Sequence, residues 1–275
     1  MRIKLDSLRL AWEINDTYFH DGFFGMVVEG KQRIGKSSYC SQAMAEAFGE
    51  WEYEEVGNRT IVARCVKPDY EQVKKWLVFL PKDFLQLIFD IPAGKKYKVL
   101  HWDDAGFWLF VLDWYEPFVK TVAKYIQLIG RKFAVLLLSS PSKKLISSKV
   151  LEAIPELLVC RVRRCGKDSY NFKPRVAKVY ERWDYPDGKK GGVYTQWKDY
   201  FNAFLPDSFW NWYKPISDKY TELGERILKA VYDSMQRKMK QTEKEEMMED
   251  VYKAVGEPEK LSEIDEVLAM YESSS

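Results

Sequence analysis

The stretch that decides the fold is Gly30-Lys31-Gln32-Arg33-Ile34-Gly35-Lys36-Ser37, which fits the pattern G-x-x-x-x-G-K-[ST]. A short β-branched run, 26–29, precedes it, and residues 36–48 follow it with the composition of a helix. A loop between a strand and a helix can bind phosphate, because its N–H groups and the positive end of the helix dipole meet at one anion. An accidental glycine turn matches this pattern in a chain of 275 residues on the order of 1% of the time. The stretch therefore predicts a P-loop that binds a nucleoside triphosphate.

Three residues at the end of this loop have predicted roles. Lys36 reaches the β- and γ-phosphates, Ser37 places its hydroxyl on Mg²⁺, and Ser38 hydrogen-bonds the α-phosphate. The predicted nucleotide-binding residues are Gly30, Lys31, Gln32, Arg33, Ile34, Gly35, Lys36, Ser37 and Ser38.

A second motif begins 63 residues after the lysine, where the apolar run 99–102 ends in Asp103 and Asp104. Such a strand fits the Walker B element, in which Asp103 holds Mg²⁺ through water and Asp104 orients or deprotonates the attacking water. Solvated aspartates in a loop are the alternative. Residues 103–106 also fit the D-x-x-G switch of GTP-binding proteins, but the chain has no N-K-x-D to read guanine. A strand at 60–65, expected between the two motif strands, favours ATP over GTP.

A third motif, Ser139-Ser140-Pro141-Ser142, follows the continuously apolar run 133–138. That run is typical of a parallel strand buried on both faces. A polar side chain at its carboxyl end lies at the ligand-binding edge of an open α/β sheet, so Ser139 is predicted to contact the γ-phosphate. A serine turn that ends the strand is the structural alternative.

The order of elements predicts an α/β fold: a P-loop NTPase with a central, mostly parallel sheet flanked by helices. Three strand-like runs, 157–164, 175–183 and 193–197, then predict a β-meander, because turn-rich segments separate them. A helix is expected after Pro215 with Ser217 as its N-cap. The predicted units are an ATPase core over 1–155, a basic aromatic meander over 156–215 and a C-terminal helical segment with an acidic tail over 216–275.

The three motifs GKQRIGKSSY, VLHWDDAGFW and LLLSSPS together resemble those of the additional-strand P-loop ATPases, which include AAA+, RecA-like and HerA/FtsK-like proteins. The context HWDDAGFWL is similar to ATPases encoded by archaeal viruses and plasmids, and the resemblance covers about residues 20–160. AAA+ proteins follow the fifth strand with a helical lid, whereas strand-like runs follow here, so the sub-family stays open. The resemblance implies a homo-oligomer in which an arginine enters the neighbouring site. Candidates are Arg131, Arg163 and Arg164, each of which can also be an ordinary surface residue.

Charge suggests a partner. Residues 241–275 hold eleven Asp/Glu and three Lys, a net charge of −8, which leaves +10 for residues 1–240. Residues 156–198 have a net charge of +6, and aromatic residues are interleaved with the basic ones. Basic side chains can contact DNA phosphates and aromatic rings can stack on bases, so this stretch could bind DNA. A half-buried sheet with aromatics inside is the alternative. The predicted DNA contacts are Lys189, Lys190, Arg175 and Lys178, and the acidic tail is a possible docking segment for another protein.

Other classes of site and location are disfavoured by composition. Four cysteines without a paired C-x-x-C and only two histidines argue against a zinc site or a disulfide framework. No apolar run approaches the ~18 residues of a membrane-spanning helix, so we expect no membrane partner and a cytoplasmic location.

The sequence thus predicts an Mg²⁺- and ATP-dependent, DNA-associated ATPase of a mobile element, acting in replication initiation, helicase loading or DNA translocation. One alternative is a small-molecule or nucleotide kinase, with Arg161, Arg163 and Arg164 as its phosphate-contacting lid. Another is a nucleotide-gated partition or packaging protein with little turnover.

Overall fold

The computed structural model describes residues 2–56, 60–110, 117–165, 175–182 and 191–239. Its strands are β1 (Arg2–Leu5), β2 (Phe24–Glu29), β3 (Glu50–Glu55), β4 (Thr60–Lys67), β5 (Leu77–Val78), β6 (Tyr97–Trp102), β7 (Phe133–Ser140), β8 (Leu157–Arg164), β9 (Arg175–Arg182) and β10 (Val193–Phe201). Its helices are α1 (Arg9–Phe19), α2 (Lys36–Phe48), α3 (Tyr70–Trp76), α4 (Pro81–Asp90), α5 (Ala105–Trp108), α6 (Pro117–Ile129), the 3₁₀ turn η2 (Lys143–Leu145), α7 (Ser148–Glu152) and α8 (Asp207–Met239).

A seven-stranded mixed sheet with the order β10-β9-β8-β2-β7-β6-β5 forms the centre of the molecule. The five strands from β8 to β5 are parallel to their neighbours, and β9 and β10 continue the sheet in antiparallel fashion. The chain is therefore an α/β protein with a mostly parallel sheet, as predicted. Strand β7 lies between β2 and β6, so one strand separates the strand before the glycine loop from the strand that ends at Asp103.

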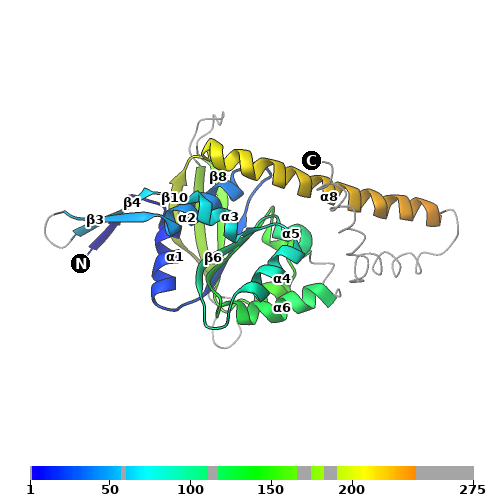
Figure 1. Ribbon diagram of the computed structural model, residues 1–275, viewed down its shortest axis with the longest axis horizontal. Coiled ribbons are helices and arrows are strands. Elements are labelled where there is room, and N and C mark those ends of the chain that lie inside the picture. The colour runs from blue at the N-terminus through cyan, green and yellow to red at the C-terminus, as the bar shows by residue number, and fades with distance from the viewer. Residues whose placement is uncertain (1, 57–59, 111–116, 166–174, 183–190, 240–275) are drawn as a thin grey trace.

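Helices cover both faces of the parallel part of this sheet (Figure 1). Alternate residues of β2 and β7 point to opposite faces: Met26 and Val135 join the core under α1 and α2, whereas Val27 and Leu136 join the core under α4 and α6. All eight residues of β7 are buried, because both of its faces are covered.

One predicted strand forms but lies elsewhere. The segment 60–65 was expected to join the main sheet between the motif strands, and this is wrong: β4 pairs with β1 and β3 in a separate three-stranded sheet. Figure 1 shows this sheet projecting beside α1. Ala63 is the only buried residue of β4, so its alternating sequence suits an edge layer, and the strand inserted between the motif strands is β7.

The expected start of the C-terminal helix is also wrong. Helix α8 begins at Asp207 and contains Pro215, whereas the sequence predicts a start after Pro215 with Ser217 as the N-cap. Proline removes one backbone hydrogen bond from a helix interior. Phe209 and Tyr213 are buried in the core beside α2, and this apolar packing holds the first turns of α8.

The first helix, α1, begins at Arg9, and strand β1 precedes it. The three strands predicted for the meander are confirmed as β8, β9 and β10. Within the described ranges no helix is long and apolar enough to cross a membrane.

Candidate functional site

The glycine loop joins the end of β2 to the start of α2 at the carboxyl edge of the sheet. Gly35 has φ of +99°, and a Cβ there would lie 2.9 Å from the Cβ of Ala203. A Cβ at Gly30 would lie 2.8 Å from the carbonyl oxygen of Val162. Both positions therefore need glycine: Gly35 for its positive φ, and Gly30 for its close approach to the backbone of Val162. The N-cap residue Gly35 has no side chain to cap the first turn of α2, whose N–H groups point toward the loop.

Lys36, the first residue of α2, folds back over this loop. Its Nζ donates to the carbonyl oxygens of Gly30 at 3.2 Å and Lys31 at 3.3 Å, and the residue is 8% exposed. Burial lowers the pKa of Lys36, while Asp104 and Asp103 act in the opposite direction. The ammonium group is therefore held among backbone oxygens with two carboxylates nearby.

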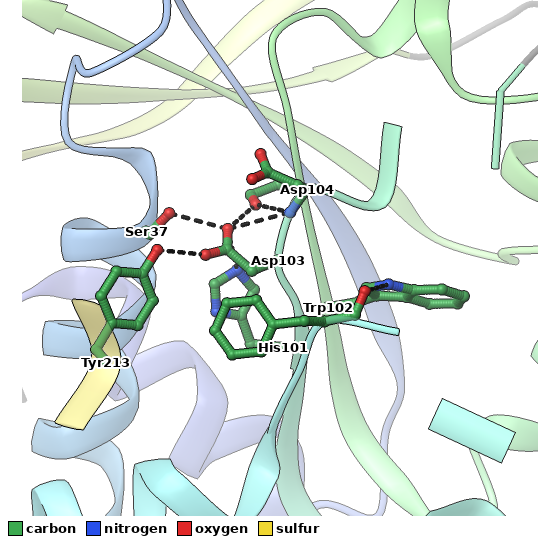
Figure 2. Close-up of polar contacts among 8 residues, drawn as sticks. Ser37, His101, Trp102, Asp103, Asp104 and Tyr213 are labelled. Atoms are coloured by element: carbon green, nitrogen blue, oxygen red, sulfur yellow. Dashed lines mark hydrogen bonds and ion pairs between the residues drawn. The ribbon is translucent and has the colours of Figure 1, made fainter. Parts of the chain in front are cut away.

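Asp103 brings the separated motifs together (Figure 2). Its Oδ1 accepts hydrogen bonds from Ser37 Oγ at 2.9 Å and from Ser139 Oγ, and its Oδ2 accepts one from Tyr213 at 2.6 Å. Burial would raise the pKa of Asp103, but His101 and the hydroxyl donors outweigh it and lower this pKa below its ordinary value. The carboxylate is thus ionised, although Asp103 is only 1% exposed.

Asp104 differs from its neighbour in backbone and in environment. It has φ of +50°, a strained value for a residue with a Cβ, and its N–H donates to Ser139 Oγ at 2.9 Å. The residue is exposed at the surface, but partial loss of water around its carboxyl and the charge of Asp103 raise its pKa to about 6, while Lys36 opposes the shift. The two carboxylates therefore titrate in different pH ranges, which is the arrangement expected of a structural anion beside a proton acceptor.

His101 lies directly beneath Asp103, with Nε2 at 3.8 Å from Oδ1. Neither ring nitrogen has a hydrogen-bond partner among the described residues, and the side chain is fully buried. Burial lowers the pKa of His101, while Asp103 opposes the shift. A neutral imidazole therefore fills this position at neutral pH.

Hard oxygen atoms make up the part of this site that faces the loop. Ser37 Oγ and the Asp103 carboxylate are in contact, and Asp104 follows in the chain. Hydroxyl and carboxylate oxygens together with phosphate and water are the ligands that Mg²⁺ uses in nucleotide sites, so the residues present fit that ion. The described residues contain no cluster of three or more His, Cys, Asp or Glu that could hold a metal.

Sequence reasoning missed the contribution of the C-terminal part of the chain. Tyr213 of α8 contacts Asp103, and Arg175 of β9 donates from Nε to the carbonyl oxygen of Ile34 at 3.2 Å. Gln42 of α2 donates to the carbonyl oxygens of Asn202 and Phe204 at 2.6 and 2.7 Å. Phe209 and Tyr213, spaced i,i+4, were the available signal, because this spacing places both on one helix face.

Arg175 is therefore a correction to the predicted DNA contacts. It is 7% exposed and holds the glycine loop, so it does not face solvent. The alternation of β9 explains this, since Arg175 shares the inner face with Ala177 and Val179. Lys178 lies on the opposite, outer face. Lys189, Lys190 and the acidic tail lie outside the described residues.

The remaining predicted residues lie at different edges of the sheet. Within the loop, Lys31, Gln32 and Arg33 are exposed, whereas Ile34 and Ser38 are buried. Arg163 and Arg164 are exposed at the carboxyl end of β8, the same edge as the loop. Arg131 is exposed just before β7, at the opposite edge, so a role at a phosphate requires a second copy of the chain.

Comparison with known proteins adds no relative: no protein-family model matches the chain, and no curated protein matches it. The geometry of the site therefore carries the functional argument.

Proposed function

We propose that the chain is a P-loop ATPase of the additional-strand class that binds ATP with Mg²⁺ and hydrolyses it. The observation that carries the proposal is the 2.9 Å hydrogen bond from Ser37 to Asp103, which joins two motifs 66 residues apart at the carboxyl edge of the sheet. Ligands of open α/β sheets bind at this edge. The strand β7 between the motif strands also agrees with that class.

The residues of the site divide the chemistry between them. The loop N–H groups and Lys36 bind and orient the phosphates. Ser37 and Asp103 would hold Mg²⁺, which when bound neutralises charge on the phosphate oxygens. Asp104, whose pKa is about 6, is ionised at neutral pH and can accept a proton from water. Ser139 fixes both aspartates, because it donates to Asp103 and accepts from the Asp104 N–H.

The proposal also includes association with DNA and action as an oligomer, which rest on the resemblance to ATPases of archaeal viruses and plasmids and on the basic meander. Replication initiation, helicase loading and DNA translocation are the processes this function fits. Contacts of the glycine loop with Arg175 and Ala203 support coupling between the nucleotide site and the C-terminal part of the chain.

The test is release of inorganic phosphate from ATP by the purified full chain with Mg²⁺ and no added acceptor. We expect turnover that depends on protein concentration and increases with DNA. Lys36→Ala is the control, since it removes the ammonium group that reaches the phosphates. Binding of ATP without phosphate release would favour a kinase or a nucleotide-gated assembly protein, and absence of ATP binding would refute the proposal.

A further inference from the structure

The three strands at one end of the main sheet have an outer face whose described side chains are exposed or half-buried. Their inner face packs in the core under α1 and α2 through Leu158, Cys160, Val162, Ala177, Val179 and Phe201. None of the described side chains on the outer face is buried; they are Leu157, Val159, Arg161, Arg163, Val176, Lys178, Tyr180, Val193, Thr195, Lys198 and Tyr200.

Three cations form a row across this outer face. Arg161 of β8 lies directly opposite Lys178 of β9, and Lys178 lies directly opposite Lys198 of β10. Neighbouring strands are about 4.8 Å apart, so the row spans about 10 Å. Like charges in directly opposite positions destabilise a sheet, which makes the row unfavourable unless an anion compensates it.

Among the residues that the structure describes, only Glu29 compensates the row. Arg161, at its inner end, forms an ion pair with Glu29, with Nη2 at 2.6 Å from Oε1. Among the described residues on the outer faces of β8, β9 and β10, none is Asp or Glu. Glu181 and Asp199 belong to the inner side, where Asp199 caps α1 by accepting from the Arg9 N–H at 2.7 Å. The face therefore attracts a polyanion.

Two tyrosines flank the row on its two sides. Tyr180 lies two residues from Lys178 on β9, and the Lys178 Nζ is 4.9 Å from the centre of its ring. Tyr200 lies two residues from Lys198 on β10 and is 65% exposed. An exposed ring beside cations suits an unpaired base, which stacks while its phosphates contact the basic side chains. An acidic protein or peptide could satisfy the cations, but it offers no base for the exposed ring to stack on.

We propose that this outer face of β8–β9–β10 binds single-stranded nucleic acid, with Lys178 and Lys198 on phosphates and Tyr200 stacked on a base. This site is separate from the loop that binds ATP in the proposed function, and it does not require nucleotide. It also assigns Lys198 and Tyr200 to nucleic-acid contact, in place of Arg175.

The test measures binding of a fluorescein-labelled dT20 oligonucleotide to the full chain by fluorescence anisotropy, without nucleotide, over a series of salt concentrations. K178Q/K198Q should weaken binding and lower the slope of log affinity against log salt by about 1.4, at about 0.7 per lost phosphate contact. The control K95Q/K124Q removes two exposed lysines from other surfaces and should bind as the wild type does.

A second pair of variants tests stacking. Tyr200→Thr keeps a strand-forming residue and should weaken dT20 binding about fivefold or more, whereas Tyr200→Phe keeps the ring and should bind normally. Wild-type affinity in both K178Q/K198Q and Tyr200→Thr would overturn the proposal. So would tighter binding of a 20-bp duplex or of polyglutamate than of dT20, because either result assigns the face to another partner. Failure of ATP turnover leaves this measurement intact, so the two proposals fail separately.

Discussion

The contact between Tyr213 and Asp103 makes a prediction in which stability and Mg²⁺ affinity change in opposite directions. The hydroxyl donates to the carboxylate over 2.6 Å, and both residues are buried. Tyr213→Phe removes one oxygen atom and keeps the ring, which packs near Phe209 and Phe79. The perturbation is therefore confined to the interactions of the hydroxyl, which are the hydrogen bond to Asp103 and contacts with Ser37 and Ser217.

The expected magnitude follows from the charge of the acceptor. A hydrogen bond to a charged group contributes about 1.5–3 kcal/mol, so Tyr213→Phe should lower the free energy of unfolding by that amount. At about 2–4 °C per kcal/mol for a chain of this size, the melting temperature should fall by about 3–12 °C. The Asp103 pKa should rise, since the hydroxyl helps to keep it low.

Affinity for Mg²⁺ should increase in the same variant. Oδ2 of Asp103 accepts the Tyr213 hydroxyl, and Ser37 and Asp103 would together hold a hydrated Mg²⁺ for which the carboxylate would act as an acceptor. Removal of the competing donor should lower the Mg²⁺ concentration needed for half-maximal binding of a fluorescent ATP analogue by about tenfold or more.

The matched control is Tyr220→Phe. Tyr220 lies on the same helix, and its hydroxyl donates to Asp83 at 3.3 Å, away from the loop. This variant should bind Mg²⁺ as the wild type does. If Tyr213→Phe lowers the melting temperature but leaves the Mg²⁺ dependence unchanged, the hydroxyl is only structural and the reasoning fails.

Three further predictions concern the carboxylates and the loop. Asp104→Asn should bind ATP but hydrolyse it slowly. In the wild type, turnover should fall about tenfold per pH unit below about pH 6, because Asp104 becomes protonated there. A flat pH–rate profile would contradict the role of Asp104 as a proton acceptor. Burial raises the pKa of Glu46 to about 7. The folded protein therefore holds this proton more tightly than the unfolded chain does, and up to about 3 kcal/mol of the free energy of unfolding is lost as pH rises from 4.5 through 7. Glu46→Gln should remove this loss in urea unfolding at pH 5 and pH 8, and an unchanged difference would assign it to another group. Gly35→Ala should abolish ATP binding in calorimetry, because position 35 has a positive φ and the Cβ of the new alanine would clash with Ala203. The double variant G35A/A203G should recover part of the stability that the single variant loses.

Much of the candidate site was predictable because its residues follow from local pattern and sheet geometry. Gly35 and Lys36 belong to a loop motif, and Asp103 and Ser139 each end an apolar strand. Parallel strands place their carboxyl ends at one edge of the sheet, so the sequence predicts that these residues lie close together if their strands are neighbours.

Long-range contacts account for what the sequence did not predict. Tyr213 reaches Asp103 from 110 residues away, and Asp199 caps α1 from a distance of 190 residues. Neither contact leaves a local pattern. Strand β4 was assigned to the wrong sheet because alternation defines a strand but not its neighbours. Pro215 was read as a helix boundary, whereas packing of Phe209 and Tyr213 stabilises the helix on its N-terminal side.

The central claim is that the loop from Gly30 to Ser37 binds the phosphates of ATP with Mg²⁺. Isothermal titration of the β,γ-imido analogue of ATP with Mg²⁺ into the full chain tests it most directly, with Lys36→Ala as the matched variant. We predict one site per chain in the wild type, weaker binding when Mg²⁺ is chelated, and loss of binding in folded Lys36→Ala. No binding by the wild type, or equal affinity in the two proteins, would contradict the claim.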